Sequence, residues 1–216
     1  MTTRVMLLSP SFDDALRTVR FPADEPLTPD GLRRARAVRA AAAALPADRA
    51  LTSPSARCRE TAEALGLRAV PDAGAAGCAM GRWRGRALED VMAAEPAAVA
   101  AWLSDPDSAA HGGETLTRLL GRVADWLAGL AAEGGRVVAV VEPDVVRAAV
   151  VGALGAPPSS FWRVDVPPLT VTELSGRDGR WNVRVAGDLG HGAAPQTPQA
   201  PQQTQAPQQT QPPQAP

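Results

Sequence analysis

The chain has 216 residues with 22 basic and 23 acidic side chains, and its net charge of −1 provides no long-range attraction to nucleic acid or to anionic membranes. Every basic residue is an arginine, which excludes Schiff-base catalysis by a lysine and a P-loop lysine. The two cysteines, Cys58 and Cys78, form neither a disulfide framework nor a zinc site by themselves.

The first third of the chain predicts two strands, each followed by a helix. Residues 4–8 form a short apolar run typical of a buried strand, and residues 49–52 form a second one. Between them, Thr28 is a suitable N-cap and Pro29 occupies the first position of an alanine-rich helix. A further helix follows the second strand and ends at Gly66. The early apolar run is too short for a signal peptide or a membrane span, so we expect a cytoplasmic protein.

The rest of the chain continues this alternation. Residues 114–132 place leucines at helical spacing and predict an amphipathic helix. The valine-rich run at 136–141 is typical of a central strand, and residues 144–154 predict another helix. Two alternating runs around a Gly-Arg-Asp-Gly turn, within residues 169–187, predict a hairpin at one edge. The alternation predicts an α/β three-layer sandwich, a mostly parallel sheet with helices on both faces.

The composition changes near the C-terminus. Residues 192–216 consist almost entirely of Pro, Gln, Ala and Thr, and the sequence APQQTQ occurs twice in tandem at 200–211. Such a segment has little apolar surface to offset the entropy of ordering. We therefore predict one domain at 1–191 followed by a disordered, solubilising tail at 192–216.

Polar residues follow three of the predicted strands. They read Ser-Pro-Ser at 9–11, Thr-Ser-Pro-Ser-Ala-Arg at 52–57 and Glu-Pro-Asp at 142–144. In an open α/β sheet, ligands bind outside the carboxyl ends of the strands. We expect the functional site where these three segments meet. Large apolar residues of the intervening region, such as Met80 and Trp102, either line a small-molecule site or belong to the core.

Several motifs occur in a fixed order along the chain, namely LTPDGLRRAR, LTSPSARCRETAEAL, GRWRG, HGGETL, RVVAVVEPDVVR and FWRVDVPPLTVTEL with GRWNVRV. Their order and spacing resemble the histidine phosphatase superfamily, whose members have the phosphoglycerate-mutase-like fold. The resemblance covers residues 3–191. Its most specific parts are the Ser-Pro-x-x-Arg segment, which ends at Arg57, and the Gly-Gly-Glu-Thr block.

The resemblance also indicates what has changed. In that family, the first strand ends in Arg-His-Gly and the histidine attacks phosphorus, whereas positions 9–11 read Ser-Pro-Ser here. The second active-site histidine, five residues before an arginine, corresponds to Glu142 when counted back from Arg147. The acid/base glutamate corresponds to Gly77. Because loss of a nucleophile costs on the order of 10⁴ to 10⁶ in turnover, the resemblance implies that phosphohistidine chemistry is absent.

Three motif residues remain candidates for ligand binding. Arg57 corresponds to a phosphate ligand of the family and lies in the first turn of a predicted helix, where an anion is favoured; the alternative is a surface ion pair with Glu60 or Glu63. Glu114 matches the Gly-Gly-Glu position, although a glutamate near a helix start is also favoured by the helix dipole. His111 precedes the two glycines of that block.

The first functional hypothesis is a recruited enzyme or ligand-binding protein for an unidentified small molecule. Glu142 and Asp144 act as catalytic acid and base, and Ser9, Ser11 and Asp13 face them across a cleft. Arg57 then holds an anion or an oxyanion. The expected molecule is neutral or cationic, and the acidic residues have no defined metal-ligand spacing, so we expect neither a metal nor a cofactor.

Two alternatives remain open. A non-catalytic scaffold or regulatory pseudophosphatase would close the old phosphate site with a salt bridge between Arg57 and Glu142, and Asp144 would only cap a helix. An atypical phosphatase would use His111 as a substitute nucleophile. We favour the first hypothesis because the strand ends are polar. We expect no nucleic-acid or membrane partner, and the sequence predicts no oligomeric state.

Overall fold

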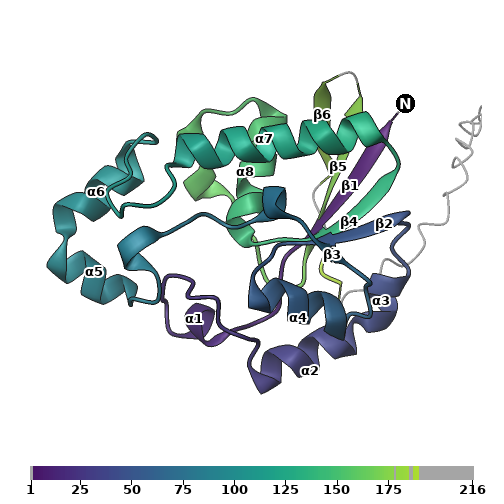
Figure 1. Ribbon diagram of the computed structural model, residues 1–216, viewed down its shortest axis with the longest axis horizontal. Coiled ribbons are helices and arrows are strands. Elements are labelled where there is room, and N and C mark those ends of the chain that lie inside the picture. The colour runs from purple at the N-terminus through teal and green to yellow at the C-terminus, as the bar shows by residue number, and fades with distance from the viewer. Residues whose placement is uncertain (1, 178, 185–186, 190–216) are drawn as a thin grey trace, which may run out of the picture.

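The computed structural model of the protein describes residues 2–177, 179–184 and 187–189 (Figure 1). Within these ranges, six strands form one sheet in the order β3-β2-β4-β1-β5-β6. The strands are β1 Thr3–Leu8, β2 Arg49–Thr52, β3 Val70–Pro71, β4 Arg136–Val140, β5 Val171–Arg177 and β6 Arg180–Arg184. The predicted tail at 192–216 lies outside the described residues.

The sheet is mixed, and its parallel part positions the site. Strands β3, β2, β4 and β1 are mutually parallel neighbours, so their carboxyl ends lie along one edge of the sheet. Strand β5 pairs antiparallel with β1, and β6 pairs antiparallel with β5, which confirms the predicted hairpin. The short strand β3 is not predicted by the sequence pattern.

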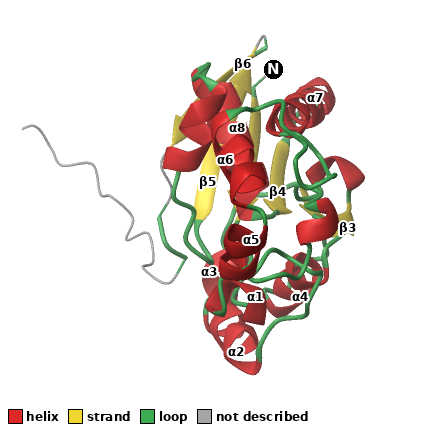
Figure 2. Cartoon of the chain, turned by 90° about the vertical axis from the view of Figure 1, so that its left-hand side faces the viewer, coloured by secondary structure: helices red, strands yellow, loops and turns green. Residues whose placement is uncertain are grey.

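Helices cover both faces of the sheet and confirm the predicted three-layer α/β architecture (Figures 1 and 2). One face carries α7 Leu116–Glu133 and α8 Pro143–Leu154, and the other carries α2 Pro29–Ala37, α3 Arg39–Ala43 and α4 Ala56–Ala64. The alternation of β1 explains the two cores. Val5 and Leu7 pack with α7 and α8, whereas Met6 and Leu8 pack with α3 and α4.

A smaller lobe stands beside the carboxyl edge of the sheet. It contains α1 Asp14–Arg17, η2 Gly81–Trp83, α5 Leu88–Ala94 and α6 Pro96–Ser104, at the left of Figure 1. Its own core includes Phe21, Trp83, Val91 and Val99. The helices within 88–104 are not predicted from the sequence, where alanine at six of the seventeen positions obscures the helical period. Two further 3₁₀ turns are η1 Ala73–Ala75 and η3 Pro158–Arg163.

Side-chain caps set the ends of the predicted helices. Thr28 accepts a hydrogen bond from the Gly31 amide at the start of α2, as predicted. Thr115 accepts one from the Arg118 amide at the start of α7, which therefore begins later than position 114. The predicted alanine-rich helix is divided at Val38 into α2 and α3. Among the described residues, no helix has the length and apolar character needed to cross a membrane.

Candidate functional site

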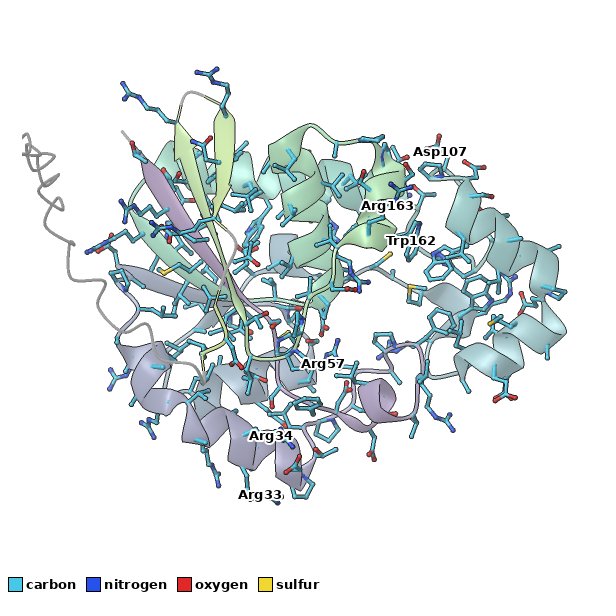
Figure 3. All side chains as sticks on the ribbon, turned by 180° about the vertical axis from the view of Figure 1, so that it is seen from behind. Arg33, Arg34, Arg57, Asp107, Trp162 and Arg163 are labelled. Atoms are coloured by element: carbon cyan, nitrogen blue, oxygen red, sulfur yellow. The ribbon has the colours of Figure 1, made fainter. Side chains whose placement is uncertain are left out.

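The candidate site lies at the carboxyl edge of the sheet, where three segments distant in sequence converge. Asp13 caps α1 after β1, Arg57 is the second residue of α4 after β2, and Glu142 is the N-cap residue of α8 after β4. Because β1, β4 and β2 are adjacent parallel strands, their following residues meet. The predicted meeting of the three strand ends is confirmed, and Arg57 marks it in Figure 3.

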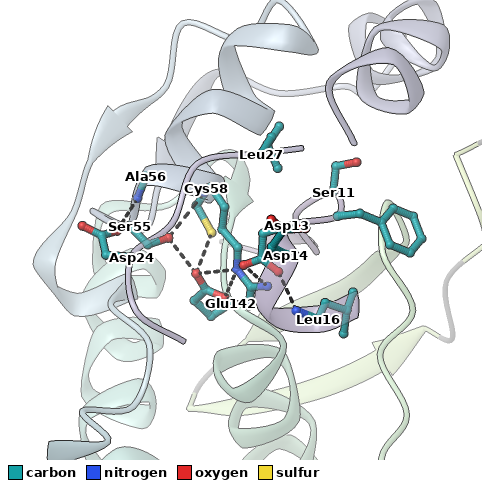
Figure 4. A network of polar contacts seen from close by, with 12 residues as sticks. Ser11, Asp13, Asp14, Leu16, Asp24, Leu27, Ser55, Ala56, Cys58 and Glu142 are labelled. Carbon is teal, nitrogen blue, oxygen red and sulfur yellow. Dashed lines mark hydrogen bonds and ion pairs between the residues drawn. The ribbon is translucent and has the colours of Figure 1, made fainter. Parts of the chain in front are cut away.

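A buried ion-pair network occupies the centre of this edge (Figure 4). The Arg57 Nε atom donates to both Glu142 carboxylate oxygens at 3.1 and 2.8 Å, Arg57 Nη2 contacts Glu142 Oε2, and Arg57 Nη1 donates to Asp13 Oδ2 at 3.1 Å. All three residues are less than a tenth exposed. Burial opposes the charged form, but the hydrogen bonds and charge of Glu142, and the charge of Asp13, raise the pKa of Arg57.

The start of α4 is also occupied by side chains of the protein. Ser55 caps the helix by accepting from the Cys58 amide, and its hydroxyl donates to Glu142 Oε1 at 2.6 Å. The Ala56 amide donates to Asp24 Oδ1 at 2.6 Å, and Asp24 adopts a left-handed backbone conformation with φ of 67°. Two of the amides that make this helix start attractive to an external anion, those of Ala56 and Cys58, therefore already have internal acceptors.

Asp144 lies two residues after Glu142, in the first turn of α8, and its carboxylate is held by backbone amides. Its Oδ2 accepts from the Cys78 amide at 2.6 Å, and its Oδ1 accepts from the Val145 amide at 2.7 Å. Burial and the neighbouring Glu142 charge raise the pKa of Asp144 to about 6, although the two amides act in the opposite direction. This carboxyl group is able to exchange a proton near neutral pH.

The neighbouring loop fixes the space around Glu142. A Cβ atom at Gly77 would lie 2.9 Å from Glu142 Cγ and 3.3 Å from Glu142 Cβ, so the glycine leaves the room that the glutamate fills. Next to it, Cys78 donates to the Glu114 carbonyl at 3.5 Å. Burial, together with the charges of Asp144 and Glu114, raises the pKa of the Cys78 thiol to about 12.

Ser9 and Ser11 do not face Glu142 across the cleft, which corrects the prediction. Both are fully buried, and neither lines the cavity. The Ser9 hydroxyl donates to the Pro167 carbonyl at 2.6 Å, and the Ser11 hydroxyl donates to the Gly31 carbonyl at 2.8 Å. Through these two hydrogen bonds, the serines connect the end of β1 to the segments that contain Pro167 and Gly31.

Glu114 and His111 also lie outside the cavity lining. Glu114 forms a two-contact ion pair with Arg122, at 2.9 and 2.7 Å. His111 is fully buried and its Nδ1 accepts from the Gly113 amide at 2.9 Å. Its ring packs against Trp83, 5.2 Å between centroids, and burial and Arg82 lower the pKa of the imidazole. Both residues hold the loop before α7 in place.

A cavity of about 440 Å³ opens beside the ion-pair network. Its lining includes Arg57, Glu142 and Asp144 at one end, and Trp162 at the other; Figure 3 shows Arg57 and Trp162 across from one another. Met80 and Trp102, expected either in the site or in the core, both line the cavity, and the aromatic residues from the loop after α1 and from η3, which also line it, are not predicted from the sequence. Trp83 is fully buried in the lobe.

Among the described residues, no group of three or more His, Cys, Asp or Glu side chains is arranged to hold a metal ion.

Comparisons with known proteins identify relatives of this fold. The family model of the histidine phosphatase superfamily (branch 1) matches residues 14–189. A search of curated proteins finds no match. Among solved structures, a mycobacterial glucosyl-3-phosphoglycerate phosphatase complexed with VO3 is 24% identical, with a TM-score of 0.75, covering 85% of this chain and 98% of that chain.

Two further structures are similar at lower identity. A putative alpha-ribazole-5′-P phosphatase from Escherichia coli is 19% identical, with a TM-score of 0.76, covering 85% of this chain and 95% of that chain. A phosphoserine phosphatase mutant from Entamoeba histolytica, in complex with phosphoserine, is 19% identical, with a TM-score of 0.77, covering 88% of this chain and 98% of that chain. These likenesses establish the fold.

Proposed function

Because the chain belongs to the histidine phosphatase superfamily, we propose that it retains the fold of that family without its phosphohistidine chemistry and that its cavity serves a neutral or cationic small molecule. Asp144 is the proposed proton-exchanging group, and Glu142 sets the charge around it. The observation that carries the proposal is the engagement of Arg57 by Glu142 and Asp13. A phosphoryl group would have to displace both carboxylates to reach the arginine.

Electrostatics supports the exclusion of phosphate. Glu142 and Asp144 both line the cavity, so an entering phosphate would approach two carboxylates. Like charges about 4 Å apart repel by roughly 1 to 4 kcal/mol at dielectrics between water and a protein surface. The loss of family histidines, inferred from Ser-Pro-Ser at 9–11 and from Glu142, removes the nucleophile as well. His111, which lies outside the cavity lining, gives no support to a substitute nucleophile.

A non-catalytic scaffold or regulatory pseudophosphatase is the second candidate. The salt bridge between Arg57 and Glu142, which that hypothesis requires, supports it directly. The small-molecule function is favoured because the cavity of about 440 Å³ lies within the roughly 300–1,000 Å³ typical of ligand sites. We further propose a cytoplasmic protein with no nucleic-acid or membrane partner.

Phosphate binding and phosphatase activity test the proposal. The wild type is expected to show no turnover of p-nitrophenyl phosphate and no thermal stabilisation by inorganic phosphate or vanadate. Glu142→Gln removes one carboxylate from Arg57 and is expected to gain stabilisation by phosphate, whereas the exposed control Glu89→Gln does not. Turnover by the wild type that is lost in Arg57→Ala would overturn the proposal.

A further inference from the structure

The cavity has two chemically different ends. The polar end is formed by Asp13, Ser55, Arg57, Glu142 and Asp144. Much of the remaining lining is apolar and is formed by Phe21, Met80, Trp102, Leu119, Phe161, Trp162 and Val166, and the lining also includes the charged residues Arg20, Asp24, Glu25, Arg84 and Arg147. A ligand that fills the space therefore needs one polar terminus and an apolar body.

The aromatic residues form one continuous wall. Ring centroids lie 4.6 Å apart for Trp102 and Trp162, 5.0 Å for Phe161 and Trp162, and 5.8 Å for Phe21 and Trp102, with edge-to-face angles of 70–84°. These residues come from the loop after α1, from α6 and from η3, so tertiary folding builds the wall. Trp102 and Trp162 are each partly exposed and present ring surface to the cavity.

The buried polar end carries an excess of negative charge. It holds three carboxylates, Asp13, Glu142 and Asp144, and one guanidinium, Arg57, which is bonded to the first two. The Asp144 carboxylate accepts hydrogen bonds from the two backbone amides of Cys78 and Val145, which carry no full charge. A carboxylate only accepts hydrogen bonds, so the group that completes this end is a donor.

Other guanidinium groups line the cavity but have acceptors or rings elsewhere. Arg147 donates from Nε to the Val164 carbonyl at 2.8 Å and lies over the Phe161 ring, 5.8 Å from its centroid. Arg20 and Arg84 are exposed and donate to the carbonyls of Gly85 and Ala23. These contacts do not neutralise the guanidinium groups, so Arg147 counts beside Arg57, and the carboxylates of Asp13, Glu142 and Asp144 exceed these two cations by one charge.

We infer that the cavity binds an organic amine, with its ammonium group against Asp144 and its apolar or aromatic body against the wall of Trp102 and Trp162. The inference rests on the proposed function, since a phosphorylated ligand would instead require Arg57. An ammonium group both donates hydrogen bonds and neutralises the excess charge. An alcohol of the same shape can donate a hydrogen bond but carries no charge, and a carboxylate is repelled.

Proton linkage follows from this arrangement. The ammonium group favours the ionised form of Asp144, whose pKa is about 6 in the free protein. At pH 5 only about one Asp144 in ten is ionised, so amine affinity is expected to fall about ten-fold between pH 7.5 and pH 5. The charged and titratable groups around Asp144 are Glu142 and Arg147 on its own helix, Asp13, Arg57, Cys78, and the Arg122–Glu114 pair.

Matched probes that differ only in the charge of the terminus test the inference. Calorimetric titrations at pH 7.5 compare tryptamine, tryptophol and indole-3-acetate, and also 2-phenylethylamine, 2-phenylethanol and phenylacetate. Each amine is expected to bind about ten- to a hundred-fold more tightly than its alcohol, and the carboxylates most weakly. Asp144→Asn is expected to abolish the preference for the amine, whereas the exposed control Asp90→Asn retains it. Trp162→Leu should weaken all members of a series alike.

The outcomes separate this inference from the proposed function. Equal binding of amine and alcohol, tightest binding of a carboxylate, or no binding of either amine would overturn the inference. The pH dependence of the wild type tests it even if Asp144→Asn fails to fold. Stabilisation of the wild type by inorganic phosphate would overturn the proposed function instead. If neither phosphate nor the amines bind, the amine inference fails alone.

Discussion

The buried pair of Arg57 and Glu142 provides the most direct test of how the site is held together. Arg57→Met leaves two buried carboxylates, those of Asp13 and Glu142, without their cation. Removing one partner of a buried pair costs about 3–5 kcal/mol in the free energy of unfolding, and we expect this full cost. Glu142→Gln is expected to cost less, about 2–3 kcal/mol.

The smaller cost of Glu142→Gln has two structural reasons. Asp13 remains 3.1 Å from the Arg57 guanidinium as a counterion, and the repulsion between Glu142 and Asp144 disappears. In the double variant, residue 142 is a neutral glutamine, so Arg57→Met no longer leaves an unpaired charge at that position. The two costs should therefore fall short of additivity by about 2–3 kcal/mol, within the range measured for residues in contact.

Urea unfolding of the wild type, both single variants and the double variant at pH 7.5 measures this coupling. For a domain of this size, Glu142→Gln should also lower Tm by about 4–12 °C. The matched control is the exposed pair of Asp48 and Arg136, which has a similar 2.7 Å contact and should show much weaker coupling because water screens it. Additivity of Arg57→Met and Glu142→Gln to within about 0.5 kcal/mol would refute the reasoning.

Three further predictions concern the groups around this pair. Gly77→Ala should destabilise the protein by about 1–3 kcal/mol in urea unfolding, because the new Cβ would lie 2.9 Å from Glu142 Cγ. Cys78, although it lines the cavity, should react with iodoacetamide at pH 8 about 10³-fold more slowly than a free thiol, because its pKa of about 12 leaves little thiolate. The pKa of Asp144 is raised from 3.8 to about 6, so the folded protein holds a proton that the unfolded chain has lost, and stability should fall by about 3 kcal/mol as the pH rises from about 4 to about 6. Asp144→Asn should remove that fall in urea titrations across this range.

Each of these predictions has a control and an opposing result. Gly121 lies in α7 with nothing within 4 Å of an added Cβ, so Gly121→Ala should leave stability unchanged or raise it by up to about 1 kcal/mol. A Gly77→Ala variant as stable as Gly121→Ala would contradict the close approach to Glu142. Urea-unfolded protein supplies the reference rate for Cys78, and equal folded and unfolded rates would exclude the raised pKa. Parallel stability profiles of wild type and Asp144→Asn would show that Asp144 titrates normally.

Much of the fold follows from local patterns. Val5, Leu7 and their alternating neighbours specify a strand buried on both faces, and Thr28 specifies the start of α2 through its hydrogen bond. The order of strands then places Arg57 near Glu142, as one of the open hypotheses requires. The lobe helices within 88–104 are not predicted because alanine, at six of these seventeen positions, marks neither a buried nor an exposed face.

The sequence alone determined the three-layer fold, the meeting of the strand ends and the identity of the residues at them. Only the tertiary structure decided where those side chains point. Ser9 turns to the Pro167 carbonyl, 158 residues away, and Ser11 to that of Gly31, whereas Asp13 turns to Arg57. Trp162 joins Trp102 across 60 residues to form the cavity wall. Such choices depend on hydrogen bonds and ring contacts between distant segments, and no local periodicity encodes them.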